Sequence, residues 1–398
     1  MRIAYLSTFY PLRGGIAHFN ERFAAELVRR GHAVRAITFS RQYPALLFPG
    51  KTQEETGGTA GEASVHAEVR VDSIGPRSWL RTGRALRRDA PDVLLFKYWI
   101  SFFAPCFWAI ACLARGNRRT RTVYVVDNFI PHEQRPGERL LRWLAFRCVD
   151  GCLVMSEAVE KDIRAAHPRL AIERSPHPVY DNFGPAQDRA AAREKLGLPH
   201  DAVIALFFGY IRPYKGLDLL IDAFPAMAAL HPKLHLVIAG ECYEDEQRYR
   251  DLVKASPLAD RIHYFGDYIP NDMVATHFSA ADVLVLPYRT ATQSGIVQIA
   301  YHFERPCIVS DVGGLGEVVL DGSTGYVVPA GGGAALVEGM RRFLNGPQDM
   351  REAIRRERRK YAWDAFAEAL ERLVAGIQRG PDGLQGRPDG ATGPSIDR

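Results

Sequence analysis

The apolar positions of the first half of the chain fall into short runs separated by stretches of helical periodicity. The runs are rich in β-branched and aromatic residues, which predicts buried strands. They span residues 2–7, 33–39, 69–74, 93–96, 121–126 and 151–155. After the first run, Phe19, Phe23 and Leu27 recur at helical spacing, and Gly31 ends that helix. Buried strands that alternate with amphipathic helices indicate a doubly wound α/β domain with a parallel sheet.

The same alternation begins again after a polar, proline-containing linker between residues 176 and 199. Its predicted strands and helices cover 203–208, 216–229, 234–239, 246–254, 262–265, 271–280, 281–288, 296–303 and 307–312. Two α/β halves of similar size should face each other across a cleft, which is the expected ligand site. We place the boundary near residue 185, giving domains at 1–185 and 186–360. A helix at 361–378 is expected to return to the first domain, and the Gly- and Pro-rich end at 379–398 to be disordered.

Composition narrows the class of protein without identifying it. The chain has 398 residues, 47% of them hydrophobic and 24% charged, as in ordinary globular proteins. A net charge of +5 is modest for this length and predicts no nucleic-acid partner. The six cysteines lie mostly inside apolar runs, and the start of the chain lacks a signal-peptide pattern. Both features predict buried thiols and a cytoplasmic location.

Two further segments carry expectations about partners. Residues 50–64 are rich in Gly, Thr and Glu and predict a mobile loop that could cover an acceptor. Residues 98–114 are almost entirely apolar and are followed at once by four arginines within 115–121. One interpretation is a buried strand end with a core helix. The other is an apolar face with a basic rim that rests on a membrane surface.

The most informative local motif is FFGYIRPYKG, at residues 207–216. A strand ends at Gly209, the loop presents Arg212 and Lys215, and a helix follows. Two cations beside the amides of a helix N-terminus predict an anion site. The alternative is a basic surface loop without a ligand, which would have the same sequence pattern. Glycine pairs, Gly14–Gly15 and Gly313–Gly314, also follow strands in both halves. Neither fits GxGxxG, and no Walker lysine motif is present, which argues against a nicotinamide cofactor and a P-loop.

Taken together, three segments carry a specific resemblance. They read GYIRPYKG, FGDYIPNDMVATHFSAADVLVLPY and SGIVQ…RPCIVSDVGGLGEVVLDGSTGYVV. Over roughly residues 1–375 the chain resembles the retaining GT-B glycosyltransferases of family 4. The resemblance implies two Rossmann-like domains facing across a cleft. It also implies a nucleoside-diphosphate sugar on the second domain, an acceptor on the first, and no metal or cofactor.

The same resemblance assigns roles to individual residues. Gly14 and Gly15 match a loop that approaches the donor phosphates, and Lys215 matches the lysine that neutralises the diphosphate leaving group. The family's arginine directly after Gly209 is replaced by Tyr210, so Arg212 is expected to substitute. The remaining donor positions are a loop whose backbone meets the nucleotide base and a loop that meets phosphate or sugar. They are Asp267, Tyr268 and Ile269, then Thr292, Gln293, Ser294, Gly295 and Ile296.

The chain departs from the family pattern at its acidic pair. The two usual glutamate positions are Ala291 and Ile299, and Gln298 is a poor replacement because it faces about 100° away on a helix. At the usual position of the first-domain histidine stands Asp127, followed by His132 in the same loop. We expect Asp127 near the sugar, with His132 as the second candidate or as a histidine with a purely structural hydrogen bond.

The sequence therefore predicts a cytoplasmic, metal-independent enzyme that transfers a sugar with retention to a glycan or lipid-linked acceptor. Surface polysaccharide or glycolipid assembly, with peripheral membrane contact, is the context that the resemblance implies. Two alternatives remain open at this point. One is a non-catalytic homologue that binds a nucleotide or glycan as a partner subunit, suggested by the missing glutamates. The other is a nucleotide-sugar epimerase on the same fold.

Overall fold

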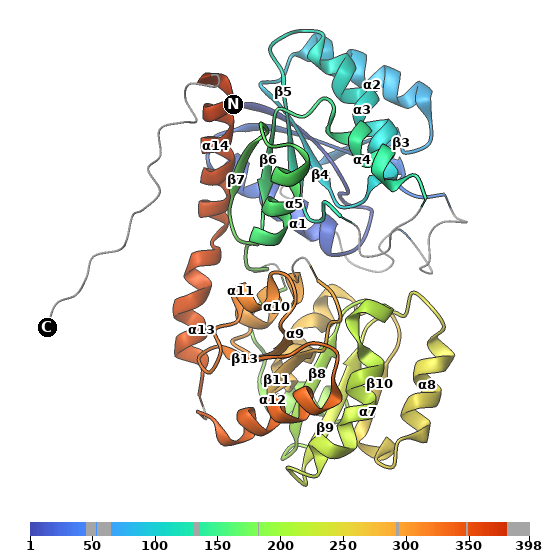
Figure 1. Ribbon diagram of the computed structural model, residues 1–398, viewed down its shortest axis with the longest axis vertical. Coiled ribbons are helices and arrows are strands. Elements are labelled where there is room, and N and C mark those ends of the chain that lie inside the picture. The colour runs from blue at the N-terminus through green and yellow to red at the C-terminus, as the bar shows by residue number, and fades with distance from the viewer. Residues whose placement is uncertain are drawn as a thin grey trace, which may run out of the picture.

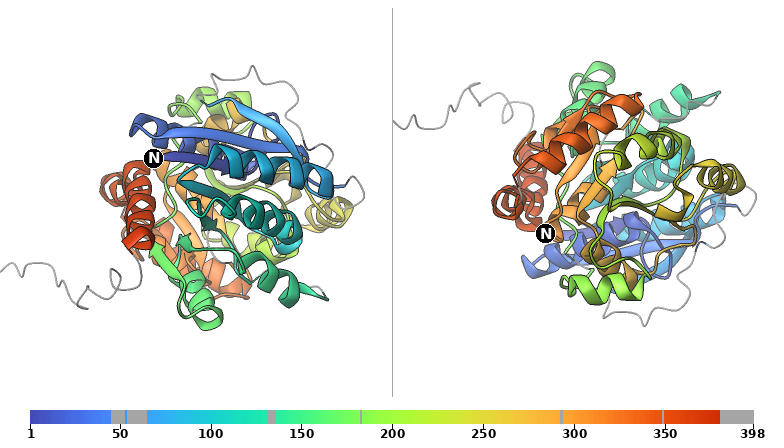
Figure 2. Two further views of the ribbon diagram at one scale, coloured as in Figure 1. Left: turned by 90° about the horizontal axis from the view of Figure 1, so that it is seen from above. Right: turned by 90° about the horizontal axis from the view of Figure 1, so that it is seen from below.

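A computed structural model of the chain describes residues 1–44, 53, 65–130, 136–181, 183–291, 294–347 and 349–379. Two parallel sheets, one of seven strands and one of six, lie in separate domains stacked along the long axis (Figure 1). Helices cover both faces of each sheet (Figure 2). The predicted fold class, two doubly wound α/β domains, is confirmed.

The N-domain sheet has the order β3-β2-β1-β4-β5-β6-β7, and all its neighbouring strands run parallel. Alternate side chains point to opposite faces: Leu95 joins the core under α1, whereas Phe96 joins the core under α3. The strands are β1 (Arg2–Leu6), β2 (Ala33–Arg41), β3 (Ala67–Asp72), β4 (Val93–Tyr98), β5 (Arg121–Val126), β6 (Gly151–Val154) and β7 (Ala171–Arg174). The helices are α1 (Gly15–Arg29), α2 (Pro76–Asp89), α3 (Ala104–Arg115), α4 (Glu138–Phe146) and α5 (Glu157–Ala166).

The C-domain sheet has the order β10-β9-β8-β11-β12-β13, also with every neighbouring pair parallel. Its strands are β8 (Val203–Phe208), β9 (Leu234–Ala239), β10 (Ile262–Phe265), β11 (Val283–Leu286), β12 (Cys307–Ser310) and β13 (Gly325–Val328). Its helices are α6 (Arg189–Lys195), α7 (Leu217–Ala228), α8 (Glu246–Ala255), α9 (Asn271–Ala280), α10 (Gly295–His302), α11 (Leu315–Val318), α12 (Gly333–Asn345) and α13 (Arg351–Arg358). Single 3-10 turns occupy Ser101–Phe103, Pro213–Lys215, Ala259–Arg261 and Arg359–Tyr361.

The last helix, α14 (Trp363–Arg379), crosses back and packs against β6, β7 and α1 of the N-domain (Figure 1). Side chains of Leu373 and Ile377 approach Gly151 so closely that a Cβ there would lie 2.6 Å from Ile377 Cδ1. Arg30 of α1 also forms an ion pair with Glu371 of α14, with its Nη2 2.8 Å from Oε2. The linker helix α6 instead belongs to the C-domain, because the fully buried Arg193 donates to carbonyls of that domain and pairs with Asp282.

The apolar segment at 98–114 is a core element. Phe103, Phe107 and Ile110 have no exposed surface, and α3 lies between α2 and α4 on the sheet. The interpretation as a buried strand end with a core helix is therefore correct. The interpretation as a membrane-facing apolar surface is wrong, because packing against the sheet consumes these side chains.

The cysteines also differ partly from expectation. All six are free thiols, and three are buried, but Cys112 on α3 is exposed. Its Sγ lies 2.7 Å from Sγ of Cys148, which follows α4. Burial raises the pKa of the Cys112 thiol to about 12, with the neighbouring Cys148 contributing in the same direction. Most of the predicted acceptor loop at 50–64, and the predicted tail beyond residue 379, lie outside the described residues.

Candidate functional site

The loop after β8 holds Lys215 in one position. Gly209 ends the strand, and Pro213–Lys215 form a 3-10 turn that closes at Gly216 with φ 66°. A Cβ at Gly216 would lie 2.1 Å from the carbonyl oxygen of Pro287, so only glycine allows the two loops to touch. The backbone of this turn therefore fixes where the Lys215 side chain begins.

Lys215 is a buried cation beside the end of the strand. Its side chain is 8% exposed, and its Nζ lies 3.3 Å from the position that a Cβ on Gly209 would occupy. Among the described residues no carboxylate comes within ion-pair distance of it. Burial, with the nearby Arg212 charge adding to it, lowers the pKa of Lys215 to about 7. A desolvated ammonium without a counter-ion is the environment in which a phosphate binds most favourably.

Two helix N-termini converge next to this lysine. Helix α10 begins at Gly295, is capped by the Ser294 hydroxyl, and places Ile296 against Gly209. Helix α1 begins at Gly15 in the other domain. Tyr180 joins them: its hydroxyl donates to the Gly15 carbonyl at 3.1 Å, and its ring lies 2.7 Å from a Cβ position on Gly295. The first turn of α10 thus lies next to Lys215, because the Ile296 side chain and the Lys215 ammonium both adjoin Gly209.

The two domains also touch through a buried ion pair at the glycine loop. Arg13 Nη2 lies 2.7 Å from Glu241 Oε2, and these side chains are 6% and 2% exposed. The Arg13 guanidinium also sits 4.3 Å from the centroid of the Tyr268 ring, in the loop predicted to meet the base. Gly14 lies beside Tyr210, whose hydroxyl would be 3.1 Å from a Cβ on that glycine. The base loop and the glycine loop are therefore brought together.

The position of the missing family arginine is filled by an aromatic contact. The rings of Tyr210 and Tyr243 are 4.4 Å apart, and the Arg212 guanidinium lies 4.9 Å from the centroid of Tyr243. Arg212 is close enough to Lys215 for its charge to lower the pKa of the ammonium. Tyr210 thus supports the loop while Arg212 supplies the second cation next to Lys215.

Asp127 lies at the end of β5 and is held by an unpredicted partner. Its Oδ1 is 2.7 Å from Nζ of Lys97, with side-chain exposures of 15% and 1%. The Lys97 ammonium also lies 3.4 Å from the centroid of Phe19. Burial lowers the pKa of Lys97, and the Asp127 charge opposes that effect. Burial raises the pKa of Tyr180, and the negative charge of Asp127 adds to that effect.

The positions without the family's carboxylates are apolar in their surroundings as well. Ile299 is 5% exposed and Ala291 packs against the C-domain core. Gln298 is 1% exposed, and its Oε1 has no hydrogen-bond partner within the part of the chain that the structure describes. Among the other predicted positions, Asp267 is exposed, Ile269 is half-buried, and His132, Thr292 and Gln293 lie outside the described residues.

Sequence reasoning missed several residues that the fold brings to this cleft. They are Arg13, Lys97, Tyr180 and Glu241. Lys97 had a readable signal, since it is a lone charge inside the apolar strand VLLFKY. Tyr180 lay in a segment interpreted as linker, and the Arg13–Glu241 pair joins residues of different domains, which no local pattern reveals.

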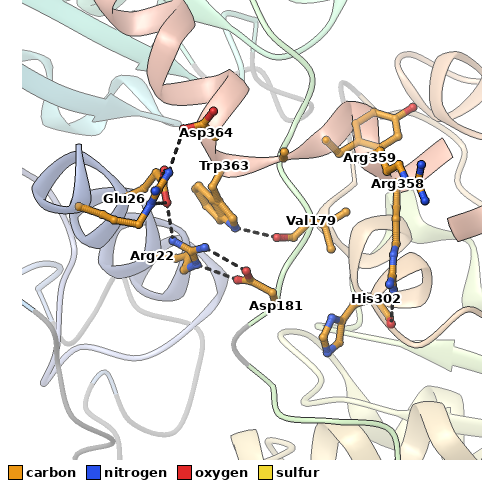
Figure 3. A pocket seen from close by; sticks show the side chains of 12 residues that line it. Arg22, Glu26, Val179, Asp181, His302, Arg358, Arg359, Trp363 and Asp364 are labelled. Carbon is orange, nitrogen blue, oxygen red and sulfur yellow. Dashed lines mark hydrogen bonds and ion pairs between the residues drawn. The ribbon is translucent and has the colours of Figure 1, made fainter. Parts of the chain in front are cut away.

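A separate hollow of about 580 Å³ lies where the chain crosses between the domains (Figure 3). None of the described donor positions lines this crossover pocket. Arg22 of α1 pairs there with Asp181, and the Trp363 indole donates to the Val179 carbonyl at 2.8 Å (Figure 3). The first bond ties one crossing segment to α1 and the second ties the two crossing segments to each other, while Arg29 of α1 pairs with Asp364 at 2.9 Å. His302, at the far end of α10, borders the same pocket. The two helices that meet at the cleft thus also meet the crossover.

Within the described ranges, no group of three or more His, Cys, Asp or Glu side chains could hold a metal ion. The described helices include none that is both long and apolar enough to cross a bilayer.

The chain matches two families that divide it at the linker: Glycosyltransferase Family 4 over residues 13–179 and Glycosyl transferases group 1 over residues 188–361. It is 31% identical to D-inositol 3-phosphate glycosyltransferase of Geodermatophilus obscurus over 96% of this chain and 90% of that protein. It is 29% identical to the protein of that name from Kineococcus radiotolerans over 89% of each chain.

Solved structures show the same architecture at low identity. Sucrose-phosphate synthase from Thermosynechococcus elongatus superposes with a TM-score of 0.70 at 18% identity, covering 95% of this chain and 100% of that one. Anabaena HepE, solved with UDP and glucose, superposes with a TM-score of 0.70 at 16% identity, covering 94% and 99%. These likenesses support the fold. With the relative that is similar over nearly the whole length, they show that the chain belongs to the family 4 (group 1) glycosyltransferases of GT-B fold and is a glycosyltransferase.

Proposed function

We propose that this glycosyltransferase takes its sugar from a nucleoside diphosphate and transfers it with retention, without a metal ion, to a glycan or lipid-linked acceptor. The observation that carries the donor assignment is Lys215, a buried cation with no carboxylate partner among the described residues, beside Gly209 and the first amides of α10. This arrangement suits the two phosphates of the donor. The proposed setting is the cytoplasmic face of a membrane, in surface polysaccharide or glycolipid assembly.

In this proposal the leaving diphosphate is the centre of catalysis. Lys215 and Arg212 meet negative charge that grows on the phosphate oxygens as the sugar departs, while the Ser294, Gly295 and Ile296 amides donate to the same group. Such fixed charges and dipoles contribute most when water is excluded. Removing one donor of this kind lowers turnover by about 100- to 1000-fold.

The sugar side of the cleft is assigned to the N-domain. Asp127 is proposed to lie near the sugar, and Lys97 holds its carboxylate in place at 2.7 Å. Thr292, Gln293 and His132 stay predictions of the sequence. Gln298 is added, because its unpartnered buried Oε1 can accept from a ligand hydroxyl or a water.

The test begins with donors. UDP-, GDP- and ADP-sugars are compared for thermal stabilisation, since a ligand at 100 times its Kd adds about 2.7 kcal/mol to the free energy of unfolding. The best donor is then assayed with lipid-linked glycan fractions, and with D-inositol 3-phosphate because relatives carry that name. The anomeric configuration of the product reports retention, and activity after treatment with a chelator reports metal independence.

Two outcomes would contradict the proposal. If none of the three nucleotide sugars stabilises the protein, the proposed donor site is wrong. If the product has the inverted configuration, the proposed retaining mechanism is wrong. Lys215→Met should abolish donor-dependent stabilisation, whereas Lys254→Met, which removes an exposed lysine of α8, should leave it intact.

A further inference from the structure

Two of the six thiols lie next to each other between α3 and α4 of the N-domain. Cys112 belongs to the last turns of α3, and Cys148 follows α4, 36 positions later in the chain. Their Sγ atoms are 2.7 Å apart, and both side chains are free thiols. Because sulfurs joined in a disulfide are about 2.05 Å apart, the two atoms need to approach each other by only about 0.7 Å to form one.

This pair is also open to a reagent in solution. Cys112 is exposed and Cys148 is half-buried. Three of the other thiols are buried, namely Cys106, Cys152 and Cys307. A small oxidant can therefore reach Cys112 and, next to it, Cys148, while the packed core protects the buried thiols.

The surroundings of Cys112 keep the pair reduced in the absence of an oxidant. Burial and the hydrogen bond to Cys148 raise the pKa of Cys112 to about 12, and the charges of Arg115 and Arg147 act in the opposite direction. Because the thiolate is the nucleophile in thiol–disulfide exchange, this thiol reacts slowly at neutral pH. In a reducing compartment the pair is expected to remain as two thiols and to close only under sustained oxidation.

Helix α4 is the element that a bond between these thiols would restrain. Phe146, at the end of α4, packs edge-on against Phe129, with ring centroids 5.0 Å apart. The Tyr124 hydroxyl of β5 donates to the Ala145 carbonyl of the same helix at 3.0 Å. Phe129 comes two residues after Asp127. Helix α4 thus supports the chain just beyond the carboxylate that is proposed to lie near the sugar.

We propose that Cys112 and Cys148 form a site of reversible oxidation, which a low-molecular-weight disulfide converts from two thiols to one intramolecular disulfide. The bond ties the chain that leaves α4 to α3, which packs beside it (Figure 1). It thereby restrains the support of the segment that follows Asp127. This inference rests on the proposed function only for the effect near the sugar. The oxidation needs neither donor nor acceptor, so its failure is distinguishable from failure of the transfer reaction.

The oxidation consists of two exchange steps. The Cys112 sulfur loses its proton and bonds to one sulfur of the external disulfide, whose other half leaves as a thiolate and takes up a proton. The Cys148 sulfur then loses its proton, attacks the Cys112 sulfur and displaces the second external thiolate, which is protonated in turn. Two protein thiols are oxidised, one external disulfide is reduced to two thiols, and no proton is gained or lost overall.

The test uses the full chain, with glutathione disulfide as the oxidant. The reduced protein is incubated with it, denatured, alkylated at its free thiols and analysed by intact mass spectrometry. The number of alkylated cysteines should fall by two from the six of the reduced protein. Peptide mapping should find Cys112 linked to Cys148 within one chain, and dithiothreitol should restore both thiols.

Three serine variants assign the reaction to this pair. Cys112→Ser should leave no intramolecular bond and no glutathione adduct at this pair. Cys148→Ser should trap the adduct on Cys112, because the second exchange step has lost its nucleophile. The matched control is Cys242→Ser, which removes a half-buried thiol that has no second thiol beside it in the described part of the chain. This control should oxidise as the native protein does.

Thermal unfolding and hydrogen exchange measure the restraint. The oxidised native protein should have a Tm about 5–10 °C above that of the reduced protein, because the bond closes a long loop in the unfolded chain. The backbone amides of α4 should also exchange more slowly in the oxidised form. Cys112→Ser, treated in the same way, should show neither change.

Three results would overturn the inference. The first is a native protein that keeps all six thiols, or that stops at an unresolved adduct on Cys112. The second is a disulfide between two chains, or an intramolecular disulfide that still forms in Cys112→Ser. The third is an oxidised protein with the Tm and the α4 exchange rates of the reduced one, in which case the inferred restraint of α4 is wrong.

Discussion

Replacing Lys215 by methionine should stabilise the free protein while it disables the enzyme. Burial lowers the pKa of this ammonium from 10.5 to about 7. At pH 7 the unfolded chain holds the proton fully, whereas the folded protein holds it about half the time. Because each tenfold change in proton affinity corresponds to about 1.4 kcal/mol, Lys215 lowers the free energy of unfolding by about 4 kcal/mol at pH 7. Methionine has a similar volume and carries no charge to desolvate.

The difference in stability between Lys215→Met and the native protein should decrease as the pH rises. Between pH 7 and about 10.5 the unfolded chain binds the proton and the folded protein does not, so the stability of the native enzyme rises with pH. The difference between Lys215→Met and the native protein should therefore shrink from about 4 kcal/mol at pH 7 to about 2 kcal/mol at pH 9. Urea unfolding followed by circular dichroism measures it, with Lys254→Met as the control for loss of an exposed lysine.

Donor binding should raise the pKa of Lys215 again. A diphosphate beside Lys215 favours its charged form, so the donor binds together with a proton above pH 7. The value of kcat/KM for the donor should then fall about tenfold per pH unit above 7, and calorimetry in buffers of different ionisation enthalpy should detect the uptake. If the Lys215→Met variant is no more stable than the native protein at pH 7, the inference that the Lys215 ammonium is desolvated is wrong. A more stable variant with unchanged turnover would remove Lys215 from the mechanism.

Three further outcomes follow from the packing around the cleft. Gly216→Ala should cost several kcal/mol of stability, measured by thermal unfolding, because the new Cβ would lie 2.1 Å from a backbone oxygen; an unchanged Tm would contradict the close approach. Arg13→Ala and Glu241→Ala should each destabilise by about 3–5 kcal/mol, with the double variant less destabilised than their sum; additive losses would mean that the cross-domain pair is not formed in solution. Lys97→Met should destabilise by a similar amount and be partly rescued by Asp127→Asn, because the second change removes the carboxylate left without its partner; urea unfolding without any rescue would refute the pairing.

Much of the fold could be read from local pattern. The strands at 203–208, 234–239 and 262–265 and the helix at 271–280 have the predicted bounds, because apolar runs in a parallel sheet are buried on both faces and stand out from their flanks. Helix α4 was not anticipated, since its outer face carries Leu140 and Trp143 and its polar residues do not alternate as in a helix half-buried in a core. The segment 98–114 was ambiguous for a related reason: apolar composition alone does not distinguish a core helix from a surface-seeking one.

Some residues of the candidate site could be identified from the sequence and others could not. Gly14, Gly209, Lys215 and the start of α10 were identifiable from sequence because each follows a strand, and the carboxyl ends of parallel strands share one edge of a sheet. The partners of these residues were not identifiable, because they come from distant parts of the chain.

The sequence by itself determined the two α/β halves, the family and the cationic loop, since these depend on periodicity and on residues close together in the chain. Only the tertiary structure decided that Lys215 is desolvated, that Lys97 holds Asp127, and that Arg13 pairs with Glu241 across the cleft. Burial and electrostatic pairing depend on which distant atoms displace water around a charge, and that is set by the packing of the domains rather than by any local pattern.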